Sequence, residues 1–279
     1  MKLNIPIEET INKRVSVRTY QPKQLSISDK KKITDEIELL SNPFDEKVRI
    51  HIIEKEDGTN TEKLGTYGVI KGAKTYLGVT VSKSEKGLLA AGFQLENLVL
   101  YATYLELGTV WLAATFNREQ FGNAIDVQKD EIFPAISPIG YPTEKRSVTE
   151  SIMRKTMNSN NRKPWAELFF NEEFGKVLTE EDAGEYAKSL EMLRKAPSAK
   201  NAQPWRVLKN NKGYHFFETH NEKTSDDEKM IKIVDVGIGL SHFYQMALDK
   251  GLEGRFEKLQ NLEINIPENT QYLISWIAL

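Results

Sequence analysis

The sequence predicts an α+β protein made of two fused homologous halves related by a pseudo-two-fold axis, each half a mixed sheet flanked by helices. The first observation is an internal repeat: residues Gly92–Trp111 superpose without gaps on Gly237–Phe256, an offset of 145 residues (237 − 92). A second stretch, Leu25–Leu40, matches Leu178–Leu193 at an offset of 153 (178 − 25). The third observation is that runs typical of strands lie between these helical segments.

The repeat also predicts the domain organisation. We expect two halves, residues 1–150 and 151–279, packed as one compact unit, because a chain of 279 residues can bury a large core. Within the second half, the C-terminal run Tyr272–Leu279 is expected to add a strand to the sheet.

Composition excludes several classes of protein. The chain has no cysteine, which excludes a disulfide scaffold and a cysteine nucleophile. Its net charge of −2 gives no bias toward nucleic acid or membranes. The first nine residues lack the apolar core of a signal peptide, so we expect a cytoplasmic location.

The histidines do not indicate a metal site. Their spacing matches no common arrangement of metal ligands, so we expect no bound metal. His51 and His215 fall within strand-like runs, where an exposed or hydrogen-bonded side chain is the simpler interpretation. No glycine-rich nucleotide-binding loop follows a strand.

Residues Gly87–Leu107 are apolar on nearly every face and predict a central core helix that ends at Gly108. Polar residues such as Gln94 and Glu96 interrupt this run, which makes it a poor membrane span. The other expected elements are helices over Ile7–Lys13, Ser28–Leu40 (with Ser28 as N-cap) and Glu180–Leu193 (with Thr179 as N-cap), and strands over Val48–Glu54, Tyr76–Val81, Thr109–Ala114, Glu131–Tyr141 and Trp205–Leu208.

Near the N-terminus, Arg14, Ser16 and Arg18 alternate along an expected extended segment and share one side of it. Two guanidinium groups with a hydroxyl between them form a good cradle for phosphate. The same pattern also occurs at a solvated edge, so both interpretations stay open at this point.

A second polar stretch lies between residues 196 and 205. Pro197 ends the preceding helix, and Ser198, Asn201 and Gln203 offer donors and acceptors between small residues. Such a segment forms either a ligand clamp or a tight connection.

Both stretches resemble motifs of the nitroreductase family. Residues 197–205 are similar to its Pro-Ser-x-x-Asn-x-Gln-Pro-Trp signature, and residues 14–20 resemble its Arg-Arg-Ser-x-Arg-x-Phe motif. Here Val15 replaces the second basic residue, so its backbone becomes the expected contact, and Tyr20 replaces the aromatic residue. The resemblance implies a nitroreductase-like fold and FMN as the cofactor.

The resemblance also implies which residues bind FMN. The N-terminal motif would hold the phosphate and the pyrimidine side, later basic residues would reach the phosphate, and the 197–203 turn would clamp the ribityl chain and ring. Because the flavin itself supplies the redox chemistry, no catalytic side chain is expected. The expected cofactor-binding residues are Arg14, Val15, Ser16, Arg18, Ile70, Lys71, Ala113, Ala114, Lys145, Arg146, Pro197, Ser198, Ala199, Asn201 and Gln203.

In ordinary nitroreductases each flavin site lies at a dimer interface, and the turn follows soon after the N-terminal motif. Here the turn arrives near residue 200, the corresponding segment Leu40–Asp45 is degenerate, and Ser151–Phe170 lacks the Arg-Ser-Arg pattern. Each half has thus lost the element that the other kept. We expect one complete FMN site and one lost site in a monomeric internal pseudo-dimer.

The resulting expectation is an FMN-dependent oxidoreductase that passes electrons from NADH or NADPH through the flavin to a small-molecule acceptor such as a nitroaromatic or a quinone. Three alternatives stay open: a flavin enzyme of the same superfamily with different chemistry, a non-enzymatic flavin-binding protein, and an unrelated α+β domain. Neither a nucleic acid nor a membrane partner is expected.

Overall fold

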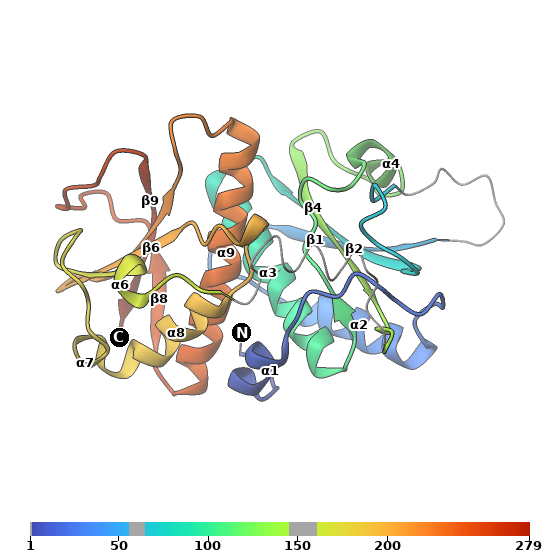
Figure 1. Cartoon of the computed structure of the whole chain (residues 1–279), viewed down its shortest axis with the longest axis horizontal. Helices are drawn as coiled ribbons and strands as arrows, with labels where there is room; N and C mark the ends of the chain where they lie inside the picture. The colour runs from blue at the N-terminus through green and yellow to red at the C-terminus, as the bar shows by residue number, and fades with distance from the viewer. Residues whose placement is uncertain (1, 56–64, 145–160) are drawn as a thin grey trace.

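Two long helices at the centre of the molecule, α3 (Glu85–Tyr104) and α9 (Asp226–Asp249), organise the fold of this computed structural model, which describes residues 2–55, 65–144 and 161–279. They pack side by side, and Figure 1 shows one β-sheet on each side of the pair. The chain is therefore an α+β protein with two sheets around a helical centre, as expected.

The first sheet has the strand order β1-β2-β4-β3, and all its ladders are antiparallel. The N-terminal segment adds two isolated parallel bridges to it, Ser16 with Thr109 and Thr19 with Lys71. Its elements are α1 (Ile7–Lys13), α2 (Ile27–Leu39), β1 (Val48–Glu54), β2 (Thr75–Ser82), β3 (Gly108–Thr109), α4 (Arg118–Gly122) and β4 (Glu131–Gly140).

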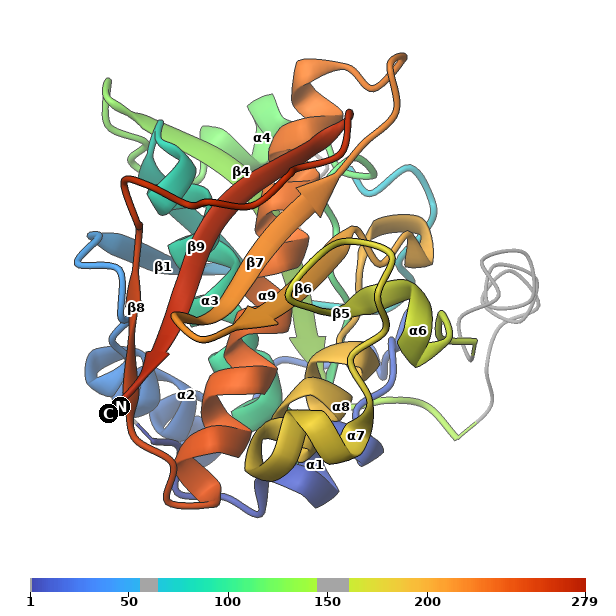
Figure 2. The same ribbon diagram turned by 90° about the vertical axis from the view of Figure 1, so that its left-hand side faces the viewer.

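The second sheet has the order β5-β6-β7-β9-β8 and is mixed, because β5 pairs with β6 in parallel. Figure 2 shows this sheet in front of α9 and α3, with the C-terminal strand β9 inside it, as predicted. Its elements are α6 (Trp165–Leu168), β5 (Phe169–Asn171), α7 (Glu180–Ala183), α8 (Ala187–Lys195), β6 (Trp205–Asn210), β7 (Gly213–Thr219), β8 (Gly254–Glu257) and β9 (Thr270–Ala278), with short 3-10 turns at Gly184–Tyr186 and Ala199–Asn201.

The two central helices cross at a pair of glycines. A Cβ atom at Gly92 would lie 2.1 Å from the carbonyl oxygen of Val234, and a Cβ atom at Gly237 would lie 2.3 Å from that of Leu89. Both pairs of equivalent positions, 92 with 237 and 89 with 234, are 145 residues apart. The contact is therefore repeated when the two halves are exchanged, as a two-fold axis through the crossing requires.

Polar contacts further along the helices repeat in the same way. Glu96 Oε1 lies 2.9 Å from His242 Nε2, and Ser241 Oγ donates to Asn97 Oδ1 at 2.8 Å. The same offset exchanges 96 with 241 and 97 with 242, so it converts one pair into the other. One pair carries ionisable groups and the other is neutral, which makes the centre of the molecule chemically asymmetric.

Two predicted boundaries were wrong for local reasons. Ser26 caps α2 in place of Ser28, because the Ser26 hydroxyl accepts the backbone N–H of Asp29 at 3.0 Å. Helix α3 ends at Tyr104, before Gly108, since Glu106 takes a left-handed conformation (φ 64°).

The predicted strand Thr109–Ala114 was also wrong over most of its length. Only Gly108 and Thr109 pair in the ladder with β4, and Leu112 makes an isolated bridge to Ile136. The chain then leaves the sheet, where the carbonyl of Ala113 accepts a hydrogen bond from Arg118 at 2.8 Å.

The predicted helix Glu180–Leu193 divides into two. Thr179 caps its first turn, as predicted, because its hydroxyl accepts the N–H of Asp182 at 3.0 Å. Gly184 then turns left-handed (φ 57°) and separates α7 from α8. Among the described residues, no helix is both long and apolar enough to cross a membrane.

Candidate functional site

The N-terminal segment runs along the first sheet and is held there by its backbone. Val17 N–H donates to the carbonyl of Thr109 at 2.9 Å, and the Lys71 N–H donates to the carbonyl of Arg18 at 2.9 Å. The approach needs glycine at one neighbouring position: a Cβ at Gly72 (φ 80°) would lie 2.1 Å from the backbone oxygen of Tyr20. Arg18 and the predicted residues Ile70 and Lys71 therefore lie together.

Arg14 and Arg18 are both largely buried, with only 8% of the Arg14 side chain exposed. Val15 between them is exposed, and Ser16 is half-buried beside Thr109. The segment thus turns its two arginine side chains into the molecule, and the phosphate cradle stays a prediction.

The carboxylate of Glu96 on α3 lies next to this cradle. Its Oε1 atom is 4.0 Å from Nε of Arg14, and its Oε2 atom accepts from Nε1 of Trp111 at 2.6 Å. With His242 on the other side, Glu96 is fully buried but has a partner on each flank. A buried carboxylate is tolerable only when it is paired in this way.

The 197–203 turn follows helix α8 and has an unusual backbone. Lys200, Asn201 and Gln203 all take left-handed conformations (φ 52°, 54° and 49°), which non-glycine residues rarely adopt. The N–H of Gln203 closes the turn by donating to the hydroxyl of Ser198 at 2.9 Å. Such strain tends to occur at binding and active sites.

Beneath the turn lies Asp235 on α9. Both of its carboxylate oxygens are 3.1 Å from the backbone N–H of Ala199. Burial raises the pKa of Asp235 to about 8, while the Ala199 N–H and the charge of Lys232 act in the opposite direction.

Arg162 connects the turn with the cradle. Its guanidinium donates to Asn201 Oδ1 at 3.2 Å and to the carbonyl of Lys195 at 2.9 Å. Burial lowers the pKa of Arg162 to about 10, and the nearby positive charges of Arg14 and Arg194 add to that shift. Arg162 is therefore hydrogen-bonded to Asn201 and lies near Arg14 of the first half.

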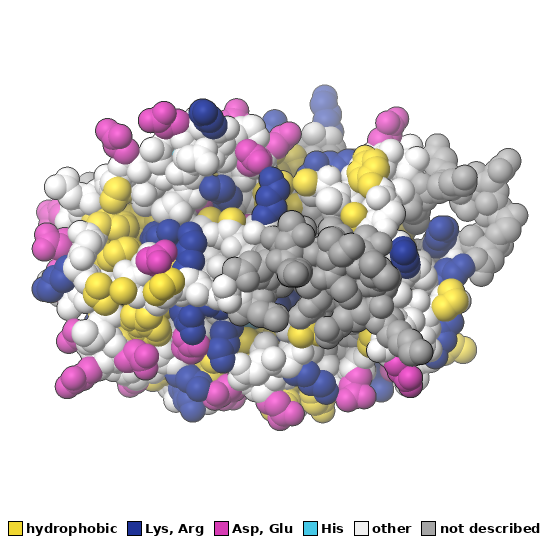
Figure 3. All heavy atoms as spheres, in the orientation of Figure 1, with side chains coloured by type: hydrophobic (Ala, Val, Ile, Leu, Met, Phe, Trp, Pro, Cys, Tyr) yellow, Lys and Arg dark blue, Asp and Glu magenta, His cyan; other side chains and the backbone are white. Residues whose placement is uncertain are grey.

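Basic residues gather on this side of the molecule. Burial lowers the pKa of Lys163 and of Arg206, and the positive charge of Arg206 lowers that of Lys163 further. Gln203 joins them to the turn, since its side-chain oxygen accepts from the Lys163 N–H at 2.8 Å. Figure 3 shows Lys and Arg side chains around α6, α8 and β6 on this face. The negative charge of Glu167 raises the pKa of both Lys163 and Arg206 and so offsets part of the effect of burial.

The remaining predicted cofactor-binding residues make no contact with this cluster that the structure describes, or lie outside the described residues. Ala113 and Ala114 lie in the loop after β3, and the contacts of this loop run to Arg118. Lys145 and Arg146, like the boundary expected after residue 150, lie outside the described residues. The assignment of the fifteen cofactor-binding residues stays a prediction.

Sequence reasoning did not select Glu96, His242, Asp235 or Arg162 as site residues. The available signal was an acidic residue inside an apolar helical run: Glu96 lies within Leu88–Leu100, and Asp235 lies within Ile233–Leu240. A buried carboxylate in such a run needs a partner, although its identity depends on the tertiary structure.

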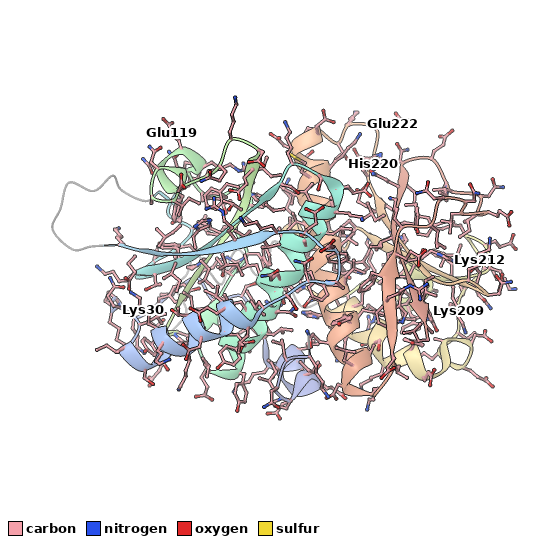
Figure 4. All side chains as sticks on the ribbon, turned by 180° about the vertical axis from the view of Figure 1, so that it is seen from behind. Lys30, Glu119, Lys209, Lys212, His220 and Glu222 are labelled. Carbon is pink, nitrogen blue, oxygen red and sulfur yellow. The ribbon has the colours of Figure 1, made fainter. Side chains whose placement is uncertain are left out.

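Two open hollows lie at the ends of the second sheet, away from these residues. One of about 440 Å³ is lined by Lys209 and Lys212, and another of about 420 Å³ is lined by His220 and Glu222. Figure 4 shows these four side chains at the outer part of the molecule, whereas α3 and α9 run through its middle. None of the thirteen predicted cofactor-binding residues that the structure describes lines either hollow.

The fold defines a two-sheet α+β protein whose halves share a pair of central helices and contribute basic segments to one cluster. The chain belongs to the nitroreductase family: a family model described as "Putative TM nitroreductase" matches residues 6–247. This membership makes the protein an oxidoreductase.

A solved structure that matches nearly the whole chain supports the fold. A "putative nitroreductase" from Thermotoga maritima has a TM-score of 0.61 and 24% sequence identity, and the match covers 99% of this chain and 95% of that chain. A nitroreductase with bound FMN from Bacteroides fragilis has a TM-score of 0.41 and 18% identity, over 52% of this chain and 92% of that chain. A "putative nitroreductase" in complex with FMN from Desulfovibrio desulfuricans has a TM-score of 0.39 and 24% identity, over 53% and 96%. No curated protein matches the chain.

Proposed function

We propose that this protein is an FMN-dependent oxidoreductase that takes electrons from NADH or NADPH and passes them to a small acceptor such as a nitroaromatic or a quinone. The observation that carries the proposal is the cluster in which Arg162 of the second half is hydrogen-bonded to Asn201 and is close enough to Arg14 of the first half for the Arg14 charge to lower its pKa. Family membership supports the same conclusion.

The residues of the cluster suit the parts of FMN. A phosphate carries two negative charges near neutral pH, and guanidinium groups bind it through planar pairs of N–H donors. Arg14 and Arg162 would hold this group between the two halves. Bound FMN would supply the redox chemistry, so the chain's own task is placement and charge.

Other residues would orient the ring. The 197–203 turn would support the ribityl chain and the flat ring, since Ala199 and Ala202 leave its backbone accessible. Arg18 and Lys71, whose backbones are hydrogen-bonded to each other at 2.9 Å, would balance negative charge on the pyrimidine side. In our proposal the two halves of the chain, residues 1–150 and 151–279, take the place of two subunits.

The first test is the absorption spectrum of the purified protein, followed by heat release and identification of the chromophore. We expect about one FMN per chain. No flavin after incubation with excess FMN would contradict the proposal, and two per chain would show that the second site is intact.

Variants of the cradle test the assignment of residues. The double variant Arg14→Ala with Arg18→Ala should lose FMN, whereas Arg14→Lys keeps the charge without the planar fork and should retain part of the affinity. Arg255→Ala, an exposed arginine on β8 paired with Glu257, is the matched control. A folded double variant that retains full flavin would contradict the assignment.

Reduction of the bound flavin by NADH and by NADPH, followed by nitroaromatic turnover, then separates a reductase from a flavin-binding protein.

A further inference from the structure

The central helices differ at the position from which α9 holds the 197–203 turn. Asp235 on α9 holds the backbone N–H of Ala199 with both carboxylate oxygens at 3.1 Å. The offset of 145 places Ala90 of α3 at the equivalent position in the first half. An alanine has no side-chain acceptor, so the first half cannot hold its own loop in this way.

The equivalent loop of the first half is held by different contacts. The loop between α2 and β1, which contains Phe44 and Glu46, takes the place of the loop between α8 and β6, which contains the 197–203 turn. The N–H of Glu46 points to the side-chain oxygen of Asn42, at 3.4 Å, within the same loop. The Asn42 amide also donates to Gln94 Oε1 on α3 at 3.0 Å, so a neutral amide and no carboxyl group joins this segment to a central helix through Asn42.

In the first half of the chain, the aromatic side chain of Phe44 packs between this loop and the central helices. Phe44 is 4% exposed, and its ring lies 5.5 Å from the ring of Phe93 on α3 and 5.5 Å from the ring of Phe256. Ala90 belongs to the same cluster of buried apolar residues. What would be the second binding site is thus part of the hydrophobic core, because aromatic packing of this kind leaves no polar surface for a ribityl phosphate.

In the second half of the chain, the 197–203 turn needs an anchor from outside the turn. Three of its residues are left-handed, a conformation that persists only where neighbouring structure enforces it. The hydroxyl of Ser198 supplies one internal bond, to the Gln203 N–H, and Asp235 supplies the bond from the protein core. A carboxyl group keeps an oxygen that can accept this N–H in both its protonated and its ionised form.

We propose that Asp235 is the positioning residue that holds the 197–203 turn in its binding conformation, and that Ala90 and Phe44 at the equivalent places limit the chain to one flavin site. This inference rests on the proposed function, because it assigns the turn to flavin binding. Asp235 acts through the turn and does not itself contact the cofactor.

FMN titrations, monitored by the quenching of flavin fluorescence, test the role of the hydrogen bond. They compare the variants Asp235→Ala and Asp235→Asn with the parent protein. The alanine variant should bind FMN at least tenfold more weakly, whereas the asparagine variant keeps a side-chain oxygen for Ala199 and should stay within about threefold of the parent protein. Ala90→Ser, the matched change on α3, should leave the affinity unchanged. Equal affinity of Asp235→Ala and the parent would overturn the inference, and so would an asparagine variant as weak as the alanine variant or two FMN per chain.

Hydrogen exchange on the flavin-free proteins separates this inference from the proposed function. Residues 197–203 should exchange faster in Asp235→Ala than in the parent, and Asp235→Asn should restore slow exchange. Unchanged exchange in Asp235→Ala would refute the positioning role even if FMN binds. Faster exchange in a protein that binds no FMN would support the anchoring of the turn, while removing both the proposed function and the limit to one flavin site.

Discussion

The imidazole of His242 and the carboxylate of Glu96 face each other at 2.9 Å across the two central helices, and neither side chain is exposed. The other ring nitrogen of His242 lies 3.1 Å from the carbonyl of Met192, which can only accept. The two ring nitrogens therefore lie against oxygen atoms of two other helices, Glu96 on α3 and Met192 on α8, so His242 links α9 to both of them.

Replacing one member of this pair should be far more costly than replacing a member of its neutral equivalent. His242→Ala leaves the Glu96 carboxylate buried with Trp111 and Arg14, and we expect a loss of about 3 kcal/mol in the free energy of unfolding. Ser241→Ala removes a single neutral hydrogen bond to Asn97 and should cost about 1 kcal/mol. Urea unfolding of both variants measures the difference. Equal losses would mean that the Glu96–His242 pair carries no special charge interaction.

The crossing of α3 and α9 at Gly92 and Gly237 predicts that the same substitution in either helix destabilises the protein to a similar extent. Gly92→Ala and Gly237→Ala each place a methyl group against a backbone oxygen of the facing helix, at 2.1 and 2.3 Å, so the helices must separate. We expect losses of about 3 kcal/mol in both variants, since overpacking against a rigid backbone has no flexible side chain to yield. Gly122→Ala on α4 meets no atom within 4 Å and serves as the control. Thermal unfolding that affects only one of the two helix variants would contradict the two-fold relation at the crossing.

Arg162 is expected to contribute to FMN affinity through charge. Arg162→Ala removes a cation that is hydrogen-bonded to Asn201 and lies near Arg14, and we expect FMN to bind about tenfold more weakly at low salt. Part of that difference should disappear at high salt, because ions screen the interaction with phosphate. Titrations at two salt concentrations, with Arg255→Ala as control, measure this. A salt-independent loss would assign Arg162 to holding Asn201 alone.

Much of the fold could be predicted because its signals are local. The apolar pattern of Ile7–Lys13 and Val48–Glu54 gave α1 and β1 with their observed bounds, and the repeat around Gly92 and Gly237 marked the two central helices. The predicted strand Thr109–Ala114 failed because tertiary contacts, here the Arg118 bond to Ala113, ended the ladder early. Such a contact cannot be read from β-propensity.

The candidate site was predictable only where residues form a motif. The arginines of the N-terminal segment and the 197–203 turn are contiguous in sequence, whereas Glu96 meets His242 from 146 residues away (242 − 96). Asp235 lies 36 residues from Ala199 (235 − 199) and has no motif of its own. Pairing of this kind follows from how the helices pack, so it becomes visible only in three dimensions.

Asp235 also makes the stability of the protein depend on pH. Burial raises its pKa to about 8 in the folded chain, whereas an unfolded aspartate titrates near 3.8. Between these values the folded state keeps a proton that the unfolded state has lost, so stability should fall as pH rises from about 4 to about 8 and level off above that. Lys232 and the Ala199 N–H oppose this effect by favouring the charged form. Asp235→Asn cannot titrate, so it should gain stability relative to the parent across this range, by up to about 5 kcal/mol. Urea unfolding at pH 5 and pH 8 on both proteins measures the change, and a constant difference between them would show that the Asp235 carboxyl does not titrate in this range.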